Sequence, residues 1–404
     1  MTQSPRILIL GSYPCVVPRH GGQIRLAEII ANYRRAGFQV QSMNLYTMTA
    51  TEARGPHDFN YPWNTPWREW NGRQIPLIDD YTAGLYAAGD ATIYARLTEA
   101  VEGEPDVIEF EHPWLLPLVE RWRAEGRFPR ALIVYGSHNI EAPLKRAILE
   151  QYGIAEAAAV AVDIDALERR ACAVADIVFA VSENDRQQLA TYGRAEALLA
   201  ANGISAWQAT PTALEHWRAQ LPACPFPLFI GSGHPPNISG FFAAIGDSLG
   251  FLAPDNRFCV VGGVSEHIAG HPRLQRWGPL NQSRLQALGM VDDDALAAIK
   301  TLAHVFVLPI TEGGGSNIKT AEALYSGKHV VGTPTSFRGF DAWLDLPGVH
   351  CVEPGPAFAR KIQELLAQPL PQDSAQDAAR RAALLWSHTL APMPATLKRY
   401  LARL

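Results

Sequence analysis

Short apolar runs alternate with longer stretches of helical periodicity along most of this chain. In the first half, the apolar runs predict strands near residues 7–10, 39–45, 107–110, 132–135 and 177–181. The periodic stretches predict helices near residues 22–36, 85–101, 115–123, 155–175 and 184–192. A second series of strands is predicted near residues 228–230, 258–261, 305–308, 330–332 and 350–352. This alternation is typical of doubly wound domains, so we predict an α/β fold.

The two series of strands predict two Rossmann-like domains. A chain of 404 residues, of which 48% are hydrophobic, can bury two cores. Residues 1–205 are predicted to form the first domain and residues 228–381 the second. Residues 206–227 are rich in Pro, Ala and Trp and lack a clear period, which predicts a linker. Residues 382–404 are predicted as a closing helix.

Composition excludes several classes of protein. The net charge of −5 and the scattered basic residues argue against a nucleic-acid partner. The five cysteines have no metal-ligand spacing, which indicates a reducing compartment and predicts a cytoplasmic location. No apolar run approaches the roughly 20 residues of a membrane span, and we expect neither a secretion signal nor a transmembrane helix.

A glycine loop follows a predicted strand of the second domain. Gly313, Gly314 and Gly315 would let the backbone approach an anion, and Ser316 and Asn317 are good N-cap residues for the next helix. The free N–H groups at the start of a helix favour phosphate. The loop therefore predicts a cradle for a nucleotide diphosphate, and its competing interpretation is a tight strand-to-helix turn.

Charged residues follow this loop on the same predicted helix. Lys319 would add a cation near the phosphates, and Glu322 is placed to accept hydrogen bonds from ribose hydroxyls. The competing interpretation of Glu322 is a solvated helix residue. Gly327 is expected to end the helix in the left-handed conformation.

A second glycine loop follows the first strand of the chain. It runs from Gly11 to Gly21 and Gly22 and leads into a helix with Arg25 on its first turn. Because its glycines do not match the Gly-x-Gly-x-x-Gly fingerprint, a nicotinamide cofactor is disfavoured.

Three further polar residues lie in loops after the next two strands. His112 follows one strand, and His138 and Glu141 follow the other. Because the carboxyl ends of parallel strands share one edge of a sheet, these side chains are expected to gather around one cleft. The competing interpretation of His138 is a strand-end histidine that is only hydrogen-bonded.

Several motifs in this order resemble the retaining family 4 glycosyltransferases of the GT-B fold. They are Gly21-Gly-x-x-Arg25, Ser137-His-Asn-Ile-Glu141, Ala175-Asp-Ile-Val-Phe-Ala-Val-Ser-Glu-Asn-Asp185, Asn202-Gly-Ile204, Gly289-Met-Val-Asp-Asp293 and the glycine cradle continued by Glu322-Ala-Leu-Tyr-Ser-Gly327. Within that family, Phe229-Ile-Gly-Ser-Gly-His-Pro-Pro-Asn237 resembles a bacterial branch that acts in the assembly of surface polysaccharides or other glycans.

The resemblance implies a fold and an activity. Two Rossmann-like domains would face a cleft, with the nucleotide sugar held by the second domain and the acceptor by the first, and the closing helix 382–404 would cross back to the first domain. The enzyme would transfer a sugar from a nucleotide-diphosphate sugar to a glycan, lipid-linked or other hydroxyl acceptor, with retention. It would need neither a metal ion nor a cofactor besides the donor.

The resemblance also implies roles for residues of this chain. His138 would contact the donor sugar or position the acceptor, with His112, Glu141 and Arg25 on the acceptor side. Lys319, the amides of Ser316 and Asn317, and the Gly21-Gly22 loop would stabilise the departing diphosphate.

The chain departs from the family at two places. The family carries two glutamates separated by seven residues; the second corresponds to Glu322, but the first falls on Gly314, which leaves Glu312 as the candidate for its role. A basic pair that neutralises the pyrophosphate is replaced by His234-Pro-Pro-Asn237, so Asn237 occupies that part of the predicted donor site.

Two other segments have competing interpretations. The run Asp292-Asp-Asp294 has carboxylates that could bind a metal ion. Because aspartates are favoured at the start of a helix, we expect a helix cap here and no metal site. The aromatic segment Tyr61–Trp70 could stack on an acceptor glycan, lie at a membrane interface, or pack its tryptophans on the domain.

Two functional alternatives remain at this point. The missing first glutamate and basic pair would suit a non-catalytic GT-B subunit that binds a nucleotide sugar or glycan for a partner transferase. A GT-B epimerase or phosphorylase is the other alternative, although no clear candidate for a pyridoxal lysine stands out.

Overall fold

The computed structural model describes residues 4–18, 21–49, 53–312 and 318–403. Residues 1–201 and 389–404 form one compact unit, here called unit 1, and residues 202–388 form unit 2. The boundaries fall after residues 201 and 388, whereas the sequence placed them after residues 205 and 381. Among the described residues, no helix combines the length and the apolar character needed to cross a membrane.

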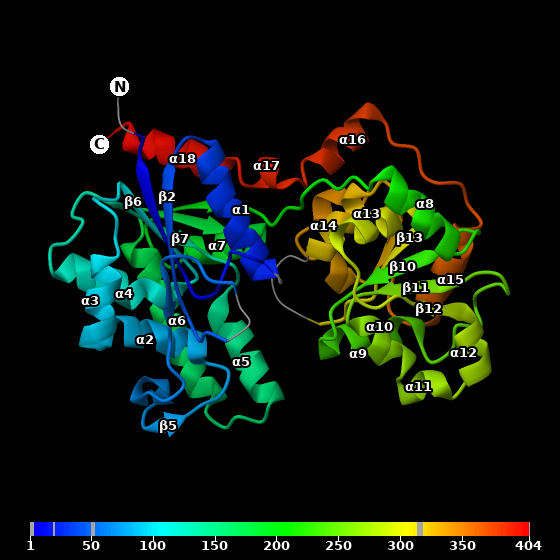
Figure 1. The fold of residues 1–404 in the computed structure, drawn as a ribbon, viewed down its shortest axis with the longest axis horizontal. Coiled ribbons are helices and arrows are strands. Elements are labelled where there is room, and N and C mark those ends of the chain that lie inside the picture. The colour runs from blue at the N-terminus through cyan, green and yellow to red at the C-terminus, as the bar shows by residue number, and fades with distance from the viewer. Residues whose placement is uncertain (1–3, 19–20, 50–52, 313–317, 404) are drawn as a thin grey trace. The chain divides into compact units, whose positions relative to one another are not determined.

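Unit 1 contains a parallel sheet with the strand order β3-β2-β1-β6-β7-β8-β9. Figure 1 labels β2, β6 and β7 of this sheet. The strands are β1 (Arg6–Gly11), β2 (Gln39–Tyr46), β3 (Asp58–Asn60), β6 (Val107–Glu111), β7 (Leu132–Gly136), β8 (Ile177–Ala180) and β9 (Glu196–Leu199). A separate antiparallel pair consists of β4 (Glu69–Trp70) and β5 (Arg73–Gln74). The apolar run of β1 is buried throughout, as expected for a central strand covered on both faces.

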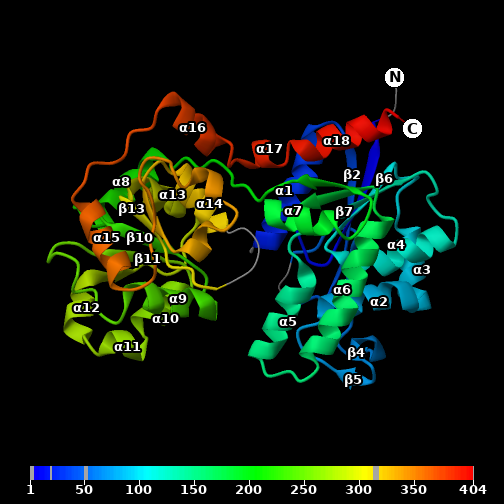
Figure 2. The same ribbon diagram turned by 180° about the vertical axis from the view of Figure 1, so that it is seen from behind.

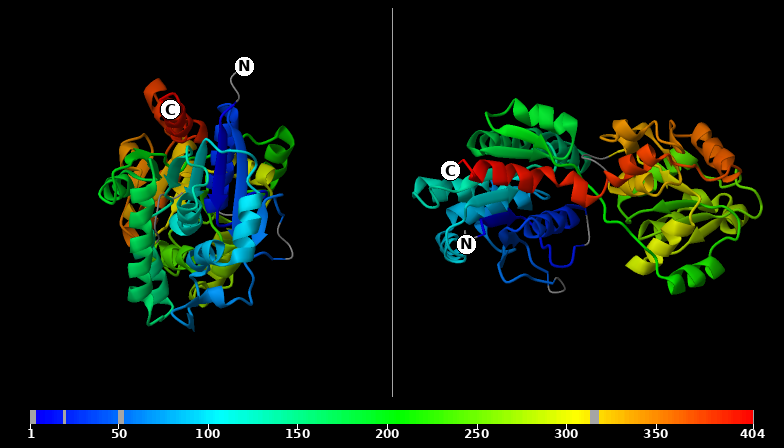
Figure 3. Two further views of the ribbon diagram at one scale, coloured as in Figure 1. Left: turned by 90° about the vertical axis from the view of Figure 1, so that its left-hand side faces the viewer. Right: turned by 90° about the horizontal axis from the view of Figure 1, so that it is seen from above.

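Helices cover this sheet and extend to the chain end. They are α1 (Gly21–Arg35), α2 (Asp79–Gly89), α3 (Ala91–Glu99), α4 (Leu116–Ala124), α5 (Glu141–Gln151), α6 (Ala157–Val174), α7 (Glu183–Ala190) and α18 (Pro392–Leu401), with short 3₁₀ turns η1 (Pro66–Arg68) and η2 (Pro113–Leu115). Figure 2 shows α5 and α6 side by side. The terminal helix α18 lies along unit 1 (Figure 3), where the Asn32 amide of α1 donates to the carbonyl of Leu390 at 2.9 Å.

The expected strands and helices of unit 1 are confirmed, and two differences follow from how the helices are capped. The helix predicted over 85–101 is divided at Asp90, whose carboxylate caps a new helix by accepting from the N–H groups of Thr92 and Ile93. Helix α5 was not predicted because its cap is not local: the carboxylate of Glu168 on α6 accepts from the N–H of Glu141. Gly37 closes α1 with a φ of 92°, as expected.

Unit 2 contains a second parallel sheet, with the order β12-β11-β10-β13-β14-β15. The strands are β10 (Pro227–Ile230), β11 (Phe258–Val261), β12 (Leu285–Ala287), β13 (Val305–Leu308), β14 (His329–Gly332) and β15 (Val349–Cys351). The helices are α8 (Pro211–Gln220), α9 (Pro235–Ile245), α10 (Val264–Ala269), α11 (Pro272–Gln275), α12 (Gly278–Arg284), α13 (Asp293–Leu302), α14 (Ile318–Tyr325), α15 (Pro356–Leu366) and α16 (Ala375–Ala382), with 3₁₀ turns η3 (Pro334–Phe337) and η4 (Asp341–Trp343).

Two expectations for this part of the chain were wrong. The predicted linker 206–227 includes helix α8, which Thr210 caps by accepting from the N–H of Ala213. The predicted closing helix 382–404 is instead the end of α16, the short helix α17 (Trp386–Thr389) and α18. Proline lacks the N–H of a helix interior, so Pro392 begins a new helix instead of continuing one.

The strand order reverses at the centre of each sheet. In unit 1, β1 pairs with β2 on one side and β6 on the other; in unit 2, β10 pairs with β11 and β13. Loops that leave two such strands diverge to opposite sides and open a crevice at the carboxyl edge, where ligands of open α/β sheets bind. The topology thus assigns one candidate ligand site to each unit.

The contact between α2 and η2 provides a test of the packing of unit 1. A Cβ atom at Gly84 of α2 would lie 1.7 Å from the carbonyl oxygen of Trp114. An alanine inside a helix normally stabilises by about 1 kcal/mol relative to glycine. We expect Gly84→Ala to lower the free energy of unfolding by about 1–3 kcal/mol instead, because the backbone carbonyl must move. Denaturant unfolding measures the change.

Gly55→Ala is the matched control, since its new Cβ would meet its nearest atom, in Asp58, at 3.4 Å. A Gly84→Ala protein as stable as the wild type or more stable would contradict the described packing of α2 on η2.

Candidate functional site

The loops that follow β1, β6 and β7 bring three aromatic side chains together in unit 1. The imidazole rings of His112 and His138 have centroids 3.9 Å apart, and the ring of Tyr13 meets that of His112 edge-on at 5.5 Å. His112 also lies near Glu141, with 3.8 Å between Nε2 and Oε1. The structure therefore places His112, His138 and Glu141 in one group at the switch point of the sheet, as the sequence predicted.

Both ring nitrogens of His138 have hydrogen-bond partners. Nε2 lies against the carboxylate of Glu111, and Nδ1 lies 3.2 Å from the hydroxyl of Tyr13. Because a carboxylate only accepts, the proton belongs on Nε2, and Nδ1 then accepts from Tyr13. Burial lowers the pKa of His138 despite the opposing effect of Glu111, so the ring is neutral at pH 7.

Glu111 and Glu109 form a buried carboxyl pair beneath His138. Burial alone raises the pKa of Glu111, but the hydrogen bond from His138, the interaction with Glu109 and the charge of Arg25 lower it to about 2. Burial and the neighbouring Glu111 raise the pKa of Glu109 well above its usual range. One proton is thus shared in favour of Glu109, which also accepts from the hydroxyl of Tyr33 at 2.6 Å.

Helix α1 supplies the positive charge of this group. Arg25 is almost completely buried, and its charge acts on Glu111, Tyr13 and Glu109. The helix begins at Gly21, and a Cβ at Gly22 would come within 2.8 Å of the Tyr13 hydroxyl. Gly22 therefore provides the close approach that lets Tyr13 reach His138, while Arg25 balances the charge of Glu111 below it.

His112 is held in an unusual backbone conformation. Its φ is 65°, in the left-handed region that non-glycine residues rarely adopt, and its N–H donates to the carbonyl of Gly136 at 2.9 Å. Within the described part of the chain, Nδ1 of this buried ring has no hydrogen-bond partner. Strained residues of this kind concentrate at functional sites, which supports a ligand-facing role for His112.

Glu141 stands at the first position of α5 in an apolar and acidic environment. Burial raises its pKa to about 8, assisted by the charges of Asp80 and Glu168 and opposed by Lys145. It is therefore largely protonated at pH 7 and can donate a hydrogen bond. One turn later, Lys145 is fixed by the carboxylate of Asp80 at 2.7 Å and the carbonyl of Leu77 at 3.0 Å.

In unit 2 the predicted donor residues lie at the switch point between β10 and β13. Lys319 of α14 donates to Oδ1 of Asn237 on α9 at 2.8 Å. Asn237 in turn donates to the carbonyl of Ser232, in the loop after β10, at 2.9 Å. Burial lowers the pKa of Lys319 to about 8, against the opposing charge of Glu322, so the ammonium remains mostly charged at pH 7.

The start of α9 has few free N–H groups. Pro235 and Pro236 occupy the first two helical positions after His234 and have no N–H group to offer. The N–H of Asn237 already donates to the carbonyl of His234 at 2.9 Å. The start of α9 therefore offers few N–H groups to an anion, and Lys319 is the nearby cation that contacts Asn237.

Glu322 lies one turn beyond Lys319 and forms an ion pair. Lys300, almost completely buried on α13, donates to Oε1 of Glu322 at 3.0 Å and lies 4.2 Å from the ring centroid of Trp207. Lys300 fixes the carboxylate through one oxygen, and the second oxygen can still accept from a ligand hydroxyl. The sequence identified Glu322 but not its partner Lys300.

The remaining predicted residues border the segment 313–317. Gly313, Gly314, Gly315, Ser316 and Asn317 lie outside the described residues, so the predicted phosphate cradle is not described. Glu312, immediately before it, is exposed. Beyond it, Gly327 ends α14 with a φ of 67°, as expected.

The acidic run before α13 behaves as a helix cap. Oδ1 of Asp292 accepts from the N–H of Ala295 at 2.8 Å, and Asp294 accepts from the N–H and hydroxyl of Thr210. The capping interpretation of this run is confirmed by Asp292, and Asp294 connects α13 to the N-cap residue of α8.

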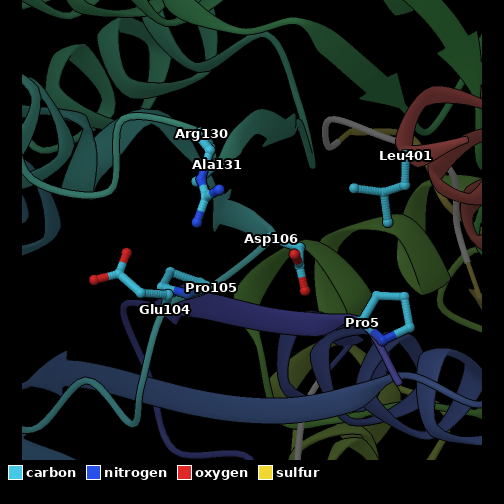
Figure 4. A pocket seen from close by; sticks show the side chains of 7 residues that line it. All are labelled: Pro5, Glu104, Pro105, Asp106, Arg130, Ala131 and Leu401. Carbon is cyan, nitrogen blue, oxygen red and sulfur yellow. The ribbon is translucent and has the colours of Figure 1, made fainter. Parts of the chain in front are cut away.

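One cavity of unit 1 lies away from this chemistry. It measures about 420 Å³ and is lined by Pro5, Glu104, Pro105, Asp106, Arg130, Ala131 and Leu401 (Figure 4). Its residues precede β1, β6 and β7, so it lies at the amino edge of the sheet, opposite the His138 group. Ligands of open α/β sheets bind at the carboxyl edge, and we therefore place the site there.

The comparisons agree with this architecture. Residues 20–203 match the family model described as glycosyl transferase 4-like domain, and residues 226–368 match the model described as glycosyl transferases group 1. A search of curated proteins by sequence found no match.

Solved structures with the same fold cover nearly the whole chain. Sucrose-phosphate synthase (tll1590) from Thermosynechococcus elongatus is 17% identical with a TM-score of 0.69, covering 99% of this chain and 100% of that one. Alr3699/HepE from Anabaena, in complex with UDP and glucose, is 18% identical with a TM-score of 0.58, covering 99% and 98%. A trehalose-6-phosphate synthase is 15% identical with a TM-score of 0.63, covering 97% and 99%.

The family models and the shared fold define the class of the protein. Two parallel Rossmann-like sheets, each matched by a glycosyltransferase domain model, identify the chain as a glycosyltransferase of the GT-B fold.

The pKa of Glu141 leads to a test on stability. A carboxyl whose pKa is raised on folding binds more protons in the folded state, so its contribution to stability decreases as pH rises from about 4.5 to about 8. Glu141→Gln removes the titration but keeps the shape. We expect the stability of the variant relative to the wild type to increase by about 2–4 kcal/mol between pH 5 and pH 9. Denaturant unfolding at each pH measures this difference.

Exposed Glu215→Gln on α8 serves as the control and should show no such trend. A stability difference between Glu141→Gln and the wild type that stays constant with pH would show that Glu141 ionises normally.

Proposed function

We propose that this glycosyltransferase moves a sugar from a nucleotide-diphosphate sugar to a hydroxyl of a glycan or lipid-linked acceptor, with retention of the anomeric configuration. Two neighbours support the donor and the stereochemistry: HepE is described in complex with UDP and glucose, and the trehalose-6-phosphate synthase in a study of glycosyl transfer with retention. Cytoplasmic action in bacterial glycan assembly is part of this proposal, with peripheral membrane contact where the acceptor is lipid-linked.

The observation that carries the proposal is that both ring nitrogens of His138 have hydrogen-bond partners. With Nε2 on Glu111 and Nδ1 on Tyr13, the ring is a neutral, oriented dipole and not a free base or nucleophile. This suits a retaining transfer in which the leaving phosphate takes the acceptor proton on the same face of the sugar. The task of unit 1 is then to orient the reacting groups and stabilise positive charge on the sugar.

We assign the nucleotide diphosphate to unit 2. Lys319, held by Asn237 at the switch point, would stabilise the negative charge that grows on the leaving diphosphate. Glu322, fixed by Lys300, would accept from the ribose hydroxyls. Gly313, Gly314, Gly315, Ser316 and Asn317 would supply backbone amides, and Glu312 would take the role of the missing first glutamate.

Metal independence is part of the same proposal. Asp292 caps α13, and Asp294 accepts a hydrogen bond from Thr210. Both aspartates of the Asp-x-Asp pattern therefore form hydrogen bonds within the fold. The cation required by a diphosphate leaving group is then Lys319, which needs no proton transfer to act.

The direct test is turnover with a panel of nucleotide-diphosphate sugars in excess EDTA, with the anomeric configuration of the product read by NMR. We expect transfer to a saccharide acceptor with the donor's configuration kept and a rate unchanged by the chelator. An inverted product would exclude retention, and activity restored only by Mg²⁺ or Mn²⁺ would exclude metal independence. Nucleotide-sugar binding without turnover would favour the accessory-subunit alternative.

The proposed division of labour leads to a second test. We expect His138→Ala to lower kcat by roughly ten- to a thousandfold while the affinity for the nucleoside diphosphate hardly changes, because His138 acts only as the bond breaks. Lys319→Ala should weaken that affinity and kcat together, because its charge meets the phosphate before and during the reaction. Calorimetry and initial rates separate the two effects.

Two surface variants are the controls. His216→Ala on exposed α8 and Lys361→Ala, whose ion pair with Glu364 lies at the surface, should change neither quantity. If His138→Ala and Lys319→Ala gave the same kinetic profile, the assignment of separate roles to the two units would be wrong.

A further inference from the structure

A second cavity of unit 1 opens at the same sheet edge as the His138 group. It measures about 290 Å³, and its lining includes Ser12 directly after β1 and Thr47 directly after β2. Asp79 and Asp80, at the start of α2, line it as well. Lys145, which binds Asp80, is one turn from Glu141 on α5. The cavity is therefore connected to the site group through α5.

Among the described residues, two cations bind the aspartates that line this cavity, and both are already engaged. Lys145 donates to both oxygens of Asp80 and to the carbonyl of Leu77. Arg68, nearly buried, donates to Asp79 at 2.7 Å, to the carbonyl of Pro62 at 2.7 Å and to the hydroxyl of Thr47. Their positive charges are neutralised by the aspartates, so the cavity presents carboxylates and hydroxyls to a ligand. Such groups bind sugar hydroxyls, whereas a phosphate would meet repulsion.

The aromatic segment 61–70 begins with Tyr61, which lines this cavity. Trp67 and Trp70 pack on the domain, where Trp70 donates to Asp163 at 2.8 Å, so the packing interpretation holds for these two. Trp63 is different, since 66% of its surface is exposed. The guanidinium of Arg68 lies 4.5 Å from the Trp63 ring and 4.3 Å from the ring of Tyr61, which lines the cavity.

This arrangement resembles a small carbohydrate site in its chemistry. An exposed indole can cover the apolar face of a sugar ring, while nearby oxygens bind its hydroxyls. Arg68 lies over the Trp63 ring, and most of the Trp63 side chain is exposed. The volume is at the lower end of the roughly 300–1,000 Å³ of ligand pockets, which suits a terminal sugar inside and a second ring on Trp63.

We propose that this cavity and Trp63 form the acceptor subsite, and that it takes the end of an uncharged oligosaccharide in preference to a phosphorylated sugar. The inference rests on the proposed transferase function and deepens it. Asp79 and Asp80 bind acceptor hydroxyls, Trp63 stacks on the next ring, and the link through Lys145 to Glu141 sets the acceptor end beside His112 and His138. Charge selects the acceptor, because Arg68 and Lys145 are paired with Asp79 and Asp80, which face the ligand.

The test is binding of uncharged and phosphorylated saccharides to the full chain without a donor. The uncharged probes are maltotriose, cellotriose, lactose and triacetylchitotriose, and the charged probe is glucose 6-phosphate, each measured by saturation-transfer-difference NMR. We expect at least one uncharged probe to bind and glucose 6-phosphate to bind at least about tenfold more weakly. Trp63→Ala should lower the affinity for the uncharged probe about five- to tenfold, and Trp63→Phe should keep most of the wild-type affinity.

Tyr152→Ala is the matched control, because Tyr152 is a similarly exposed aromatic side chain of unit 1, 65% exposed at the end of α5. Asp79→Asn keeps an oxygen for Arg68 but removes a negative charge. This variant should therefore reduce the difference in affinity between the uncharged probe and glucose 6-phosphate. Three outcomes would each overturn the proposal. None of the uncharged probes binds, or glucose 6-phosphate binds as tightly as they do, or Trp63→Ala and Tyr152→Ala reduce the affinity for the uncharged probe equally.

Calorimetric titration of the same samples with UDP separates this inference from the proposed function. UDP binding with no saccharide binding would remove the subsite and leave the donor assignment in place. Saccharide binding that follows the expected pattern supports the subsite even if a different nucleotide serves as donor.

Discussion

The organisation of unit 1 depends on one buried negative charge, the carboxylate of Glu111. A carboxylate at the end of a central parallel strand is out of reach of water, so its charge must be balanced within the fold. The N–H of His138, the positive charge of Arg25 and a protonated Glu109 provide that balance. The same constraint requires glycine at position 136, where a Cβ atom would lie 2.1 Å from Glu111 Oε1.

The balance of this charge determines the chemistry of the site. The carboxylate of Glu111 holds the His138 proton on Nε2, and the hydroxyl of Tyr13 bonds to Nδ1 on the other side of the ring. Gly22 has no Cβ atom that would collide with this hydroxyl. The result is an uncharged imidazole with a fixed direction. Burial of Glu141 itself raises the pKa of this carboxyl to about 8 and keeps it protonated at pH 7. In the proposed mechanism, the His138 group of unit 1 would present neutral, oriented groups to a sugar, and Lys319 of unit 2 would present its charge to a phosphate.

The sequence predicted much of this arrangement because its signals are local. Apolar runs located the central strands, and the loops after them located His112, His138 and Glu141 at one edge. Lys319 and Asn237 were predicted separately, and their contact became visible only in the structure. Glu109 and Glu111 carried an unused signal: two acidic residues at alternate positions on one face of an otherwise apolar strand.

What the sequence missed depends on partners distant in the chain. The cap of α5 comes from Glu168, so no local pattern predicts that helix. Lys300 contacts Glu322 from another helix, and β3, β9 and β12 are short edge strands with weak apolar signals. Tyr13 carries no motif of its own, because its role follows from the 3.2 Å contact with His138.

The most direct test of this account is the protonation state of His138, read from long-range ¹H–¹⁵N correlations on selectively labelled protein. The account predicts a neutral ring at pH 7 with the proton on Nε2, and a pKa below the ordinary histidine value. The signal should be assigned by its loss in His138→Gln. A charged imidazole at pH 7, or a proton on Nδ1, would contradict the hydrogen bonds on which the site and its proposed mechanism are built.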